Sequence, residues 1–188
     1  MLKNTKLVAG VIVLAVLVVI VAIWNARRGG NTVTIDLLSQ LGDAQKRSTW
    51  TQTTETLFGV KDVTIAGQTH KAIFAPPFSR IKFKIEVPRR GVLEVFYALR
   101  EDAWTADGDG AHFRIGVSDG RTYEEYLKET INPKARERDR KWLPATIDLS
   151  AYEGQMVELV FNTDPGPPDN RDSRNDFCLW ADPKIKGR

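Results

Sequence analysis

The sequence predicts a mainly β protein, an antiparallel β-sandwich that follows one N-terminal transmembrane helix and includes one or two short helices. Three observations support this fold class. Leu7 to Trp24 is an uninterrupted apolar run, about eight short segments after residue 60 have strand composition, and Gly, Pro and Asp separate those segments. Alternation with one apolar face is typical of antiparallel sheets that face solvent on one side, so two packed sheets are expected.

The apolar run holds no charged residue, and ten of its 18 residues are Val or Ile. A helix of this length spans about 27 Å, close to the roughly 30 Å of a bilayer core. A cleaved signal peptide is the alternative, but its apolar region is usually about 7–15 residues long. Trp24 suits the membrane interface, and Gly10, Ala15 and Ala22 are small enough to let a neighbouring helix approach. We therefore expect an uncleaved membrane span.

The charge of the chain is unevenly distributed. Lys3 and Lys6 precede the run and Arg27 and Arg28 follow it, so the flanking charges do not decide the orientation of the span. These four are the only charged residues before residue 32, which leaves 23 of the 27 Lys and Arg against all 24 Asp and Glu. The remainder is slightly acidic, and nucleic acid is not an expected partner.

The chain divides into three expected segments. Residues 1–28 would form the tail and the span, residues 29–60 a juxtamembrane linker, and residues 61–188 the β-sandwich domain. Within the linker, Asp36 can cap a short helix that ends near Gly42.

Strand signals follow one another after the linker. In residues 80–87, Ile, Phe and Val alternate with Arg, Lys and Glu, the pattern of a strand with one buried face. The segments expected to form strands are 63–65, 72–74, 81–87, 92–99, 113–117, 143–149, 157–161 and 177–180. A further helix signal is Tyr-Glu-Glu-Tyr-Leu-Lys at residues 123–128.

Three stretches of the domain resemble bacterial galactose-binding-like jelly rolls, a fold used by carbohydrate-binding modules. They are WLPATIDLSAYEGQMVELVFNTDPG at 142–166, WADP at 180–183 and DGAHFRIGVSDG at 109–120, and the resemblance covers roughly residues 60–186. It implies a jelly-roll β-sandwich that works outside the cytoplasm. We therefore expect a single-pass protein of the bacterial inner membrane, with its N-terminus cytoplasmic and its domain periplasmic or extracellular. The fold itself serves many functions.

Two tryptophans are candidates for carbohydrate binding. Trp104 and Trp142 lie beside predicted turns, where ligand-binding loops are found. Large aromatic residues also dominate cores and protein interfaces, so core packing and a protein contact are the alternatives at both positions.

Four aspartates are candidates for a structural calcium site, which jelly rolls of this kind often hold. Asp107 and Asp109 begin a pattern similar to a calcium loop, and Asp164 and Asp172 lie in a later acidic loop. The EF-hand pattern is incomplete because Ala111 stands where a third ligand is required. Solvated loops are the alternative, and no other cofactor is expected.

Catalytic motifs are weak. Residues 116–120 match G-x-S-x-G, but His70 and His112 both precede Ser118, which is the wrong order for a hydrolase triad. Cys178 is the only cysteine and lies in an apolar segment, so it is expected to be buried.

The sequence thus favours a membrane-anchored, extracytoplasmic, non-catalytic β-sandwich. Its expected partners are the lipid bilayer and other membrane or envelope proteins, on which it would dock as an accessory or scaffolding subunit. A cell-surface carbohydrate-binding module is the alternative function, and a hydrolase is a third.

Overall fold

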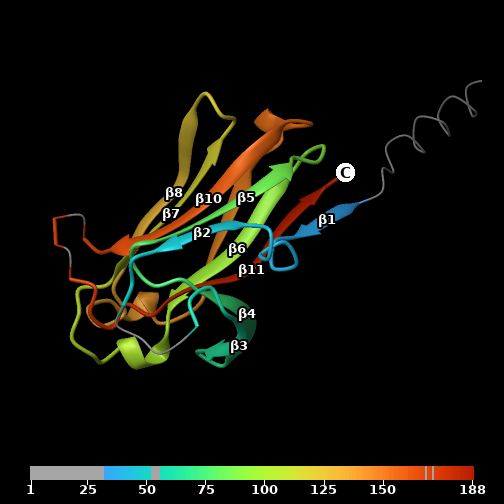
Figure 1. The fold of residues 1–188 in the computed structure, drawn as a ribbon. Helices are drawn as coiled ribbons and strands as arrows, with labels where there is room; N and C mark the ends of the chain where they lie inside the picture. The colour runs from blue at the N-terminus through green and yellow to red at the C-terminus, as the bar shows by residue number, and fades with distance from the viewer. Residues whose placement is uncertain (1–31, 52–55, 168, 171) are drawn as a thin grey trace, which may run out of the picture. The chain divides into compact units, whose positions relative to one another are not determined.

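The computed structural model describes residues 32–51, 56–167, 169–170 and 172–188, which fold as two antiparallel β-sheets (Figure 1). The six-stranded sheet has the order β3-β4-β11-β6-β9, and β1 also pairs with β11. Its strands are β1 (Val33–Asp36), β3 (Val60–Ile65), β4 (Gln68–Phe74), β6 (Val92–Leu99), β9 (Leu143–Asp148) and β11 (Cys178–Gly187). The antiparallel sandwich expected from the sequence is confirmed.

The five-stranded sheet has the order β2-β5-β10-β7-β8. Its strands are β2 (Gln45–Ser48), β5 (Ser79–Glu86), β7 (Ala111–Ser118), β8 (Tyr123–Ile131) and β10 (Met156–Pro165). The helices assigned among the described residues are three short 3₁₀ turns, η1 (Glu101–Ala103), η2 (Glu137–Asp139) and η3 (Ser150–Tyr152).

The main hydrophobic core is built from the apolar face of each strand. In β5, Ile81, Phe83 and Ile85 are almost fully buried, as their alternation with charged residues predicts. At the centre, Trp180 of β11 packs edge-on against Phe113 and Phe161, with ring centroids 5.0 and 5.1 Å away. Edge-to-face aromatic pairs add stability beyond the area they bury.

A second hydrophobic cluster covers part of the opposite face of the six-stranded sheet. Successive residues of a strand point to opposite faces, so Leu179 and Ala181 lie on this side while Trp180 faces the core. The cluster consists of Ile65, Ala72, Phe74, Ala98, Trp142, Leu179 and Ala181. The outer face of the five-stranded sheet differs, because its strands carry polar and charged side chains there.

The short helix expected after Asp36 is not observed. Residues 33–36 instead form β1, which pairs with the end of β11, and a series of turns follows. Asp36 still caps locally, because its Oδ1 accepts a hydrogen bond from the backbone NH of Leu38 at 3.0 Å. The folded unit therefore begins at Val33, well before the expected boundary at residue 61, because β1 and β2 each belong to a sheet.

The helix expected at residues 123–128 is also wrong, since these residues lie in β8 and pair with β7. The register of this pair shifts by one residue, and Tyr126 is the extra residue of a β-bulge. The bulge places both Glu125 and Lys128, three residues apart, opposite outward-facing residues of β7. The normal alternation of a strand is therefore broken, and residues three apart share one face, as they would in a helix.

Among the described residues, the structure has no helix that is both long and apolar enough to span a bilayer. The predicted span from Leu7 to Trp24, with Gly10, Ala15 and Ala22, lies outside the described residues.

Candidate functional site

The outer face of the five-stranded sheet carries a row of basic side chains. Five residues are paired in register across all five strands: Arg47 of β2, Arg80 of β5, Asn162 of β10, Arg114 of β7 and Lys128 of β8. Paired residues on adjacent antiparallel strands project from the same face of a sheet. The row thus places four cations and one amide side by side.

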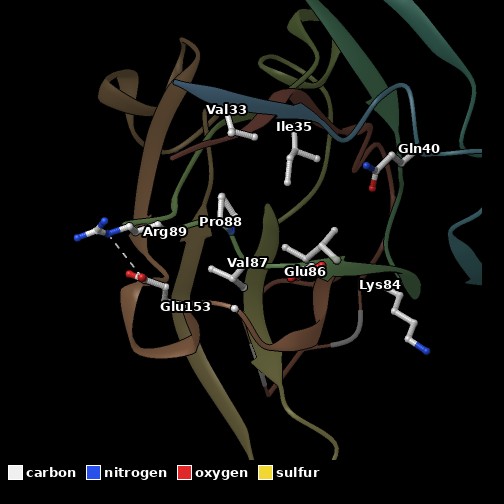
Figure 2. A pocket seen from close by; sticks show the side chains of 11 residues that line it. Val33, Ile35, Gln40, Lys84, Glu86, Val87, Pro88, Arg89 and Glu153 are labelled. Carbon is white, nitrogen blue, oxygen red and sulfur yellow. Dashed lines mark ion pairs between the residues drawn. The ribbon is translucent and has the colours of Figure 1, made fainter. Parts of the chain in front are cut away.

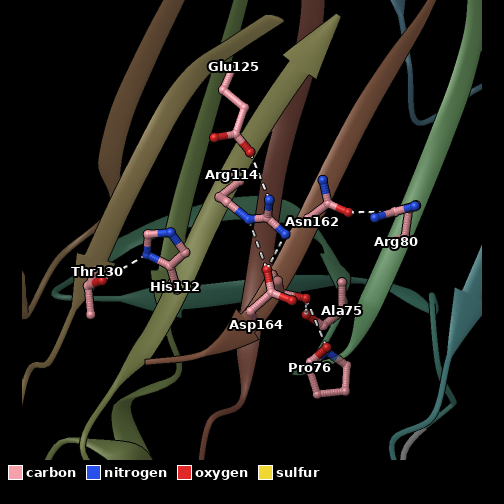
Figure 3. A network of polar contacts seen from close by, with 10 residues as sticks. Ala75, Pro76, Arg80, His112, Arg114, Glu125, Thr130, Asn162 and Asp164 are labelled. Carbon is pink, nitrogen blue, oxygen red and sulfur yellow. Dashed lines mark hydrogen bonds and ion pairs between the residues drawn. The ribbon is translucent and has the colours of Figure 1, made fainter. Parts of the chain in front are cut away.

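Hydrogen bonds fix the middle of this row (Figure 3). Arg80 Nε donates to Asn162 Oδ1 at 2.7 Å. Arg114 donates from Nε and Nη2 to Asp164 Oδ2 at 2.9 and 2.6 Å, and from Nη1 to Glu125 Oε1 at 2.7 Å. The guanidinium of Arg114 is therefore held between two carboxylates, and charge-assisted bonds of this kind are strong and directional.

One hollow adjoins the row on the side of Asp164. It has a volume of about 330 Å³ and is lined by Phe78, His112, Arg114, Lys128, Asp164, Pro165 and Asn170. The Nδ1 atom of His112 lies 2.8 Å from Thr130 Oγ1, and burial, with a smaller contribution from Arg114, lowers the histidine pKa. His112 is therefore neutral at pH 7. Phe78 has a φ of 63°, a costly conformation for a bulky residue that is often found at functional sites.

A second hollow, of about 230 Å³, adjoins the row on the side of Tyr123. It is lined by Arg80, Lys82, Arg114, Ser118, Tyr123, Glu158 and Val160. The Tyr123 ring lies against Gly116, where an added Cβ atom would come within 2.4 Å of the ring. Glycine is thus required for the ring to lie this close to the sheet, while 46% of Tyr123 remains exposed. Arg114 lines both hollows, which therefore adjoin at this residue, and the two together are called the groove.

The groove combines an exposed aromatic ring with hydrogen-bond donors and acceptors that are held in place. The Ser-His pair of a serine hydrolase is not formed in it. Ser118 and His112 are six residues apart on β7, which at about 3.3 Å per residue separates them by roughly 20 Å. The Ser118 hydroxyl instead accepts a hydrogen bond from the backbone NH of Gly120 at 3.2 Å.

A larger hollow of about 530 Å³ lies between β1 and the end of β5 (Figure 2). Its apolar lining includes Val33, Ile35, Ile85, Val87 and Pro88. The charged ends of Lys84 and Arg89 point away from it, and Arg89 forms an ion pair with Glu153 at 3.7 Å. The lining of this hollow also includes the polar residues Gln40, Glu86 and Glu153 but no aromatic residue, whereas the groove has the exposed Tyr123 ring, and we therefore place the candidate site in the groove.

The two predicted carbohydrate-binding tryptophans lie on the other sheet. Trp142 is 3% exposed, belongs to the second hydrophobic cluster and donates its indole NH to Gln68 O at 3.0 Å. It thus has the core-packing role that was the alternative. Trp104 is half-buried against the same cluster, with its indole NH 3.3 Å from Leu99 O. A sugar contact at Trp104 stays a prediction.

The four aspartates predicted to bind calcium have different surroundings. Asp107 pairs with Lys134 at 2.8 Å, Asp164 with Arg114 at 2.6 Å, and Asp172 with Arg174 at 2.7 Å. In the part of the chain that the structure describes, no three Asp, Glu, His or Cys residues are arranged to hold a metal ion. A calcium site that includes Asp109 stays a prediction.

Two acids near these loops have poorly solvated carboxyl groups, the buried Asp176 and the half-buried Asp109. Asp176 is 2% exposed, and its Oδ2 has no hydrogen-bond partner. Burial, followed by the carboxylates of Asp109 and Asp172, raises the pKa of Asp176 to about 8. Burial and then Asp172 also raise the pKa of Asp109. Asp176 therefore holds a proton at neutral pH.

Of the groove residues, sequence reasoning selected Asp164, as a calcium candidate, and missed the basic row beside it, although part of the signal is visible. The alternation in residues 80–86 puts Arg80, Lys82 and Lys84 on one face, and His112 and Arg114 share a face by the same rule. The missing information was the strand order, which sets these residues beside one another.

No family model matches the chain. An uncharacterised protein of Archaeoglobus fulgidus is 36% identical over 104 residues, which is 55% of this chain and 26% of that protein. The chain thus spans about a quarter of the length of that relative.

Solved structures with a similar fold include carbohydrate-binding modules. The CBM51 module of Clostridium perfringens GH95, in complex with methyl-galactose, matches 81% of this chain and 99% of its own, with a TM-score of 0.53 and 10% identity. The M60 catalytic domain with two CBM51 domains of Clostridium perfringens ZmpB matches 76% of this chain and 14% of its own, with a TM-score of 0.50 and 12% identity. At such low identity these matches show the fold alone: the described domain is an antiparallel β-sandwich similar to that of the CBM51 module.

Proposed function

We propose that the chain is a non-catalytic carbohydrate-binding module that holds a polysaccharide in the groove on the five-stranded sheet. The observation that carries this proposal is the exposed Tyr123 ring, laid on Gly116 beside Arg80, Asn162 and Arg114. A pyranose has an apolar face of CH groups and a rim of hydroxyls. The aromatic ring fits the apolar face, and the polar groups supply donors and acceptors for the hydroxyls.

The rigidity of the groove supports this function. Arg114 is held by two carboxylates and Arg80 by an amide before any ligand arrives. Side chains already fixed in place lose less conformational entropy on binding, which favours affinity for a weakly bound, hydrated ligand such as a sugar. The fold shared with a module crystallised with methyl-galactose is consistent with the proposal, although fold alone does not define function.

A docking role in a membrane assembly has weaker support. The large hydrophobic side chains exposed on the described domain come from four different strands: Val33, Val60, Tyr123, Tyr126 and Met156. Large contiguous apolar patches often mark protein interfaces, and these side chains are distributed over several strands. The apolar run at residues 7–24 supports the narrower proposal that the module is anchored to a membrane and displayed outside the cytoplasm.

The experiment is a binding titration of the full chain, in detergent, against soluble galactan, xylan, laminarin and polygalacturonate. We expect at least one polysaccharide to bind, and Tyr123→Ala to weaken binding about tenfold because the stacking surface is lost. Tyr126→Ala is the matched control, since its hydroxyl contacts Glu124 and Tyr152 rather than the groove. The proposal fails if the wild-type chain binds none of the four, or if Tyr123→Ala binds as tightly as the control.

A further inference from the structure

The charge of the groove indicates a more specific ligand, and this inference rests on the proposed function. We infer that the polysaccharide is acidic and that Arg80, with its neighbour Arg47 and with Lys128 at the far end of the row, binds its carboxylate groups. The ligand would thus contain uronic acid units and would not be built of neutral hexoses alone.

The outer face of the five-stranded sheet is more basic than the domain as a whole. Its strands place six cations there, Arg47, Arg80, Lys82, Lys84, Arg114 and Lys128, against four acids, Glu86, Glu125, Glu158 and Asp164. Residues 32–188 in total have one more acid than base. The positive charge is therefore gathered on the face that carries the groove, where it would attract an anionic polymer.

The acids on this face neutralise only some of the cations. Arg114 pairs with Asp164 and Glu125, and Lys82 pairs with Glu158 at 2.7 Å. Arg80 has the neutral amide of Asn162 as its hydrogen-bond partner. Among the described residues, no carboxylate lies within ion-pair distance of Arg47, Arg80, Lys84 or Lys128. These cations are available to a ligand.

Two of the available cations directly oppose each other. Arg47 and Arg80 are register partners on the adjacent strands β2 and β5, and like charges in that position destabilise a sheet. A bound anion between them would relieve the repulsion. The Nε of Arg80 is taken by Asn162, and its terminal nitrogens can meet a carboxylate with the planar geometry that guanidinium groups favour.

The test compares polygalacturonate, neutral galactan, dextran sulfate and duplex DNA as ligands of the full chain in detergent, at one fixed ionic strength. We expect polygalacturonate to bind about tenfold more tightly than galactan, which is the effect of one charge-assisted hydrogen-bond pair. Arg80→Gln should remove that tenfold advantage, because it should weaken polygalacturonate binding about tenfold more than it weakens galactan binding. Lys71→Gln is the matched control, because it removes the same charge from an exposed position of β4 on the other sheet.

The outcomes separate this inference from the proposed function. Equal binding of galactan and polygalacturonate, unaffected by Arg80→Gln, overturns the acidic ligand and leaves carbohydrate binding in place. Tighter binding of dextran sulfate or DNA, or an equal loss in Lys71→Gln, also overturns it, because general charge attraction would then account for the affinity. If the chain binds none of the polysaccharides, both proposals are overturned.

Discussion

Replacing Asp176 by Asn should change how the stability of the domain depends on pH. The pKa of Asp176 is raised to about 8 in the folded protein, against an ordinary value of 3.8. Between these values the folded state holds a proton that the unfolded state has lost. The free energy of unfolding therefore falls as pH rises, by about 1.4 kcal/mol per unit. From pH 5 to pH 7.5 the loss from this group is about 3 kcal/mol.

Asn has nearly the shape of a protonated Asp and carries no charge at any pH, so the variant should avoid this loss. For a domain of this size, 3 kcal/mol corresponds to roughly 6–12 °C in melting temperature. The assay is thermal unfolding of the wild type and of Asp176→Asn at pH 5 and pH 7.5, with EDTA present so that no metal ion neutralises the acids. Asp169→Asn, an exposed change in the same loop, is the control.

We expect the melting temperature of the variant to exceed that of the wild type by roughly 6–12 °C more at pH 7.5 than at pH 5. Parallel changes in the two melting temperatures would refute the reasoning, because they would show that Asp176 does not carry a raised pKa in the folded state.

Three other substitutions test the packing and the groove. Gly116→Ala should lift the Tyr123 ring and lower polysaccharide affinity about as far as removing that ring does, with little change in melting temperature; unchanged affinity would argue against the aromatic platform. Trp142→Ala should cost about 3–5 kcal/mol in chemical denaturation and leave the polysaccharide affinity of the folded protein unchanged, since Trp142 packs on the other sheet. Thr163→Val should cost about 1–3 kcal/mol by the same assay, because the buried hydroxyl donates to Ala75 O at 2.7 Å; a neutral result would show that the lost bond is replaced.

The alternation of single strands was a reliable guide to the core. Residues 81–85 showed which side chains would be buried, because a strand with one face in the core has a strict period of two. The same rule failed at β8, where the bulge at Tyr126 breaks the period. Local spacing there favoured a helix, and pairing with β7 determined the strand.

The groove could not be assembled from the sequence alone. Arg47, Arg80, Arg114, Lys128 and Asn162 are far apart in the chain and meet through the strand order β2-β5-β10-β7-β8. Similarly, nothing in the composition around residue 142 distinguishes a tryptophan in an outer hydrophobic cluster from one that faces a ligand. The assembly of the groove and the surroundings of Trp142 both depend on long-range strand pairing.

The position of β11 has a consequence for how the chain folds during synthesis. This strand lies in the middle of the six-stranded sheet and pairs with β1, β4 and β6, all of which precede it in the chain. Val33, for example, cannot form its strand pairing until Gly187 has been synthesised. Such non-local pairing slows folding, and on the ribosome β1, β4 and β6 would keep open edges until β11 emerges. The nascent chain should therefore depend on protection from aggregation until this strand has been made.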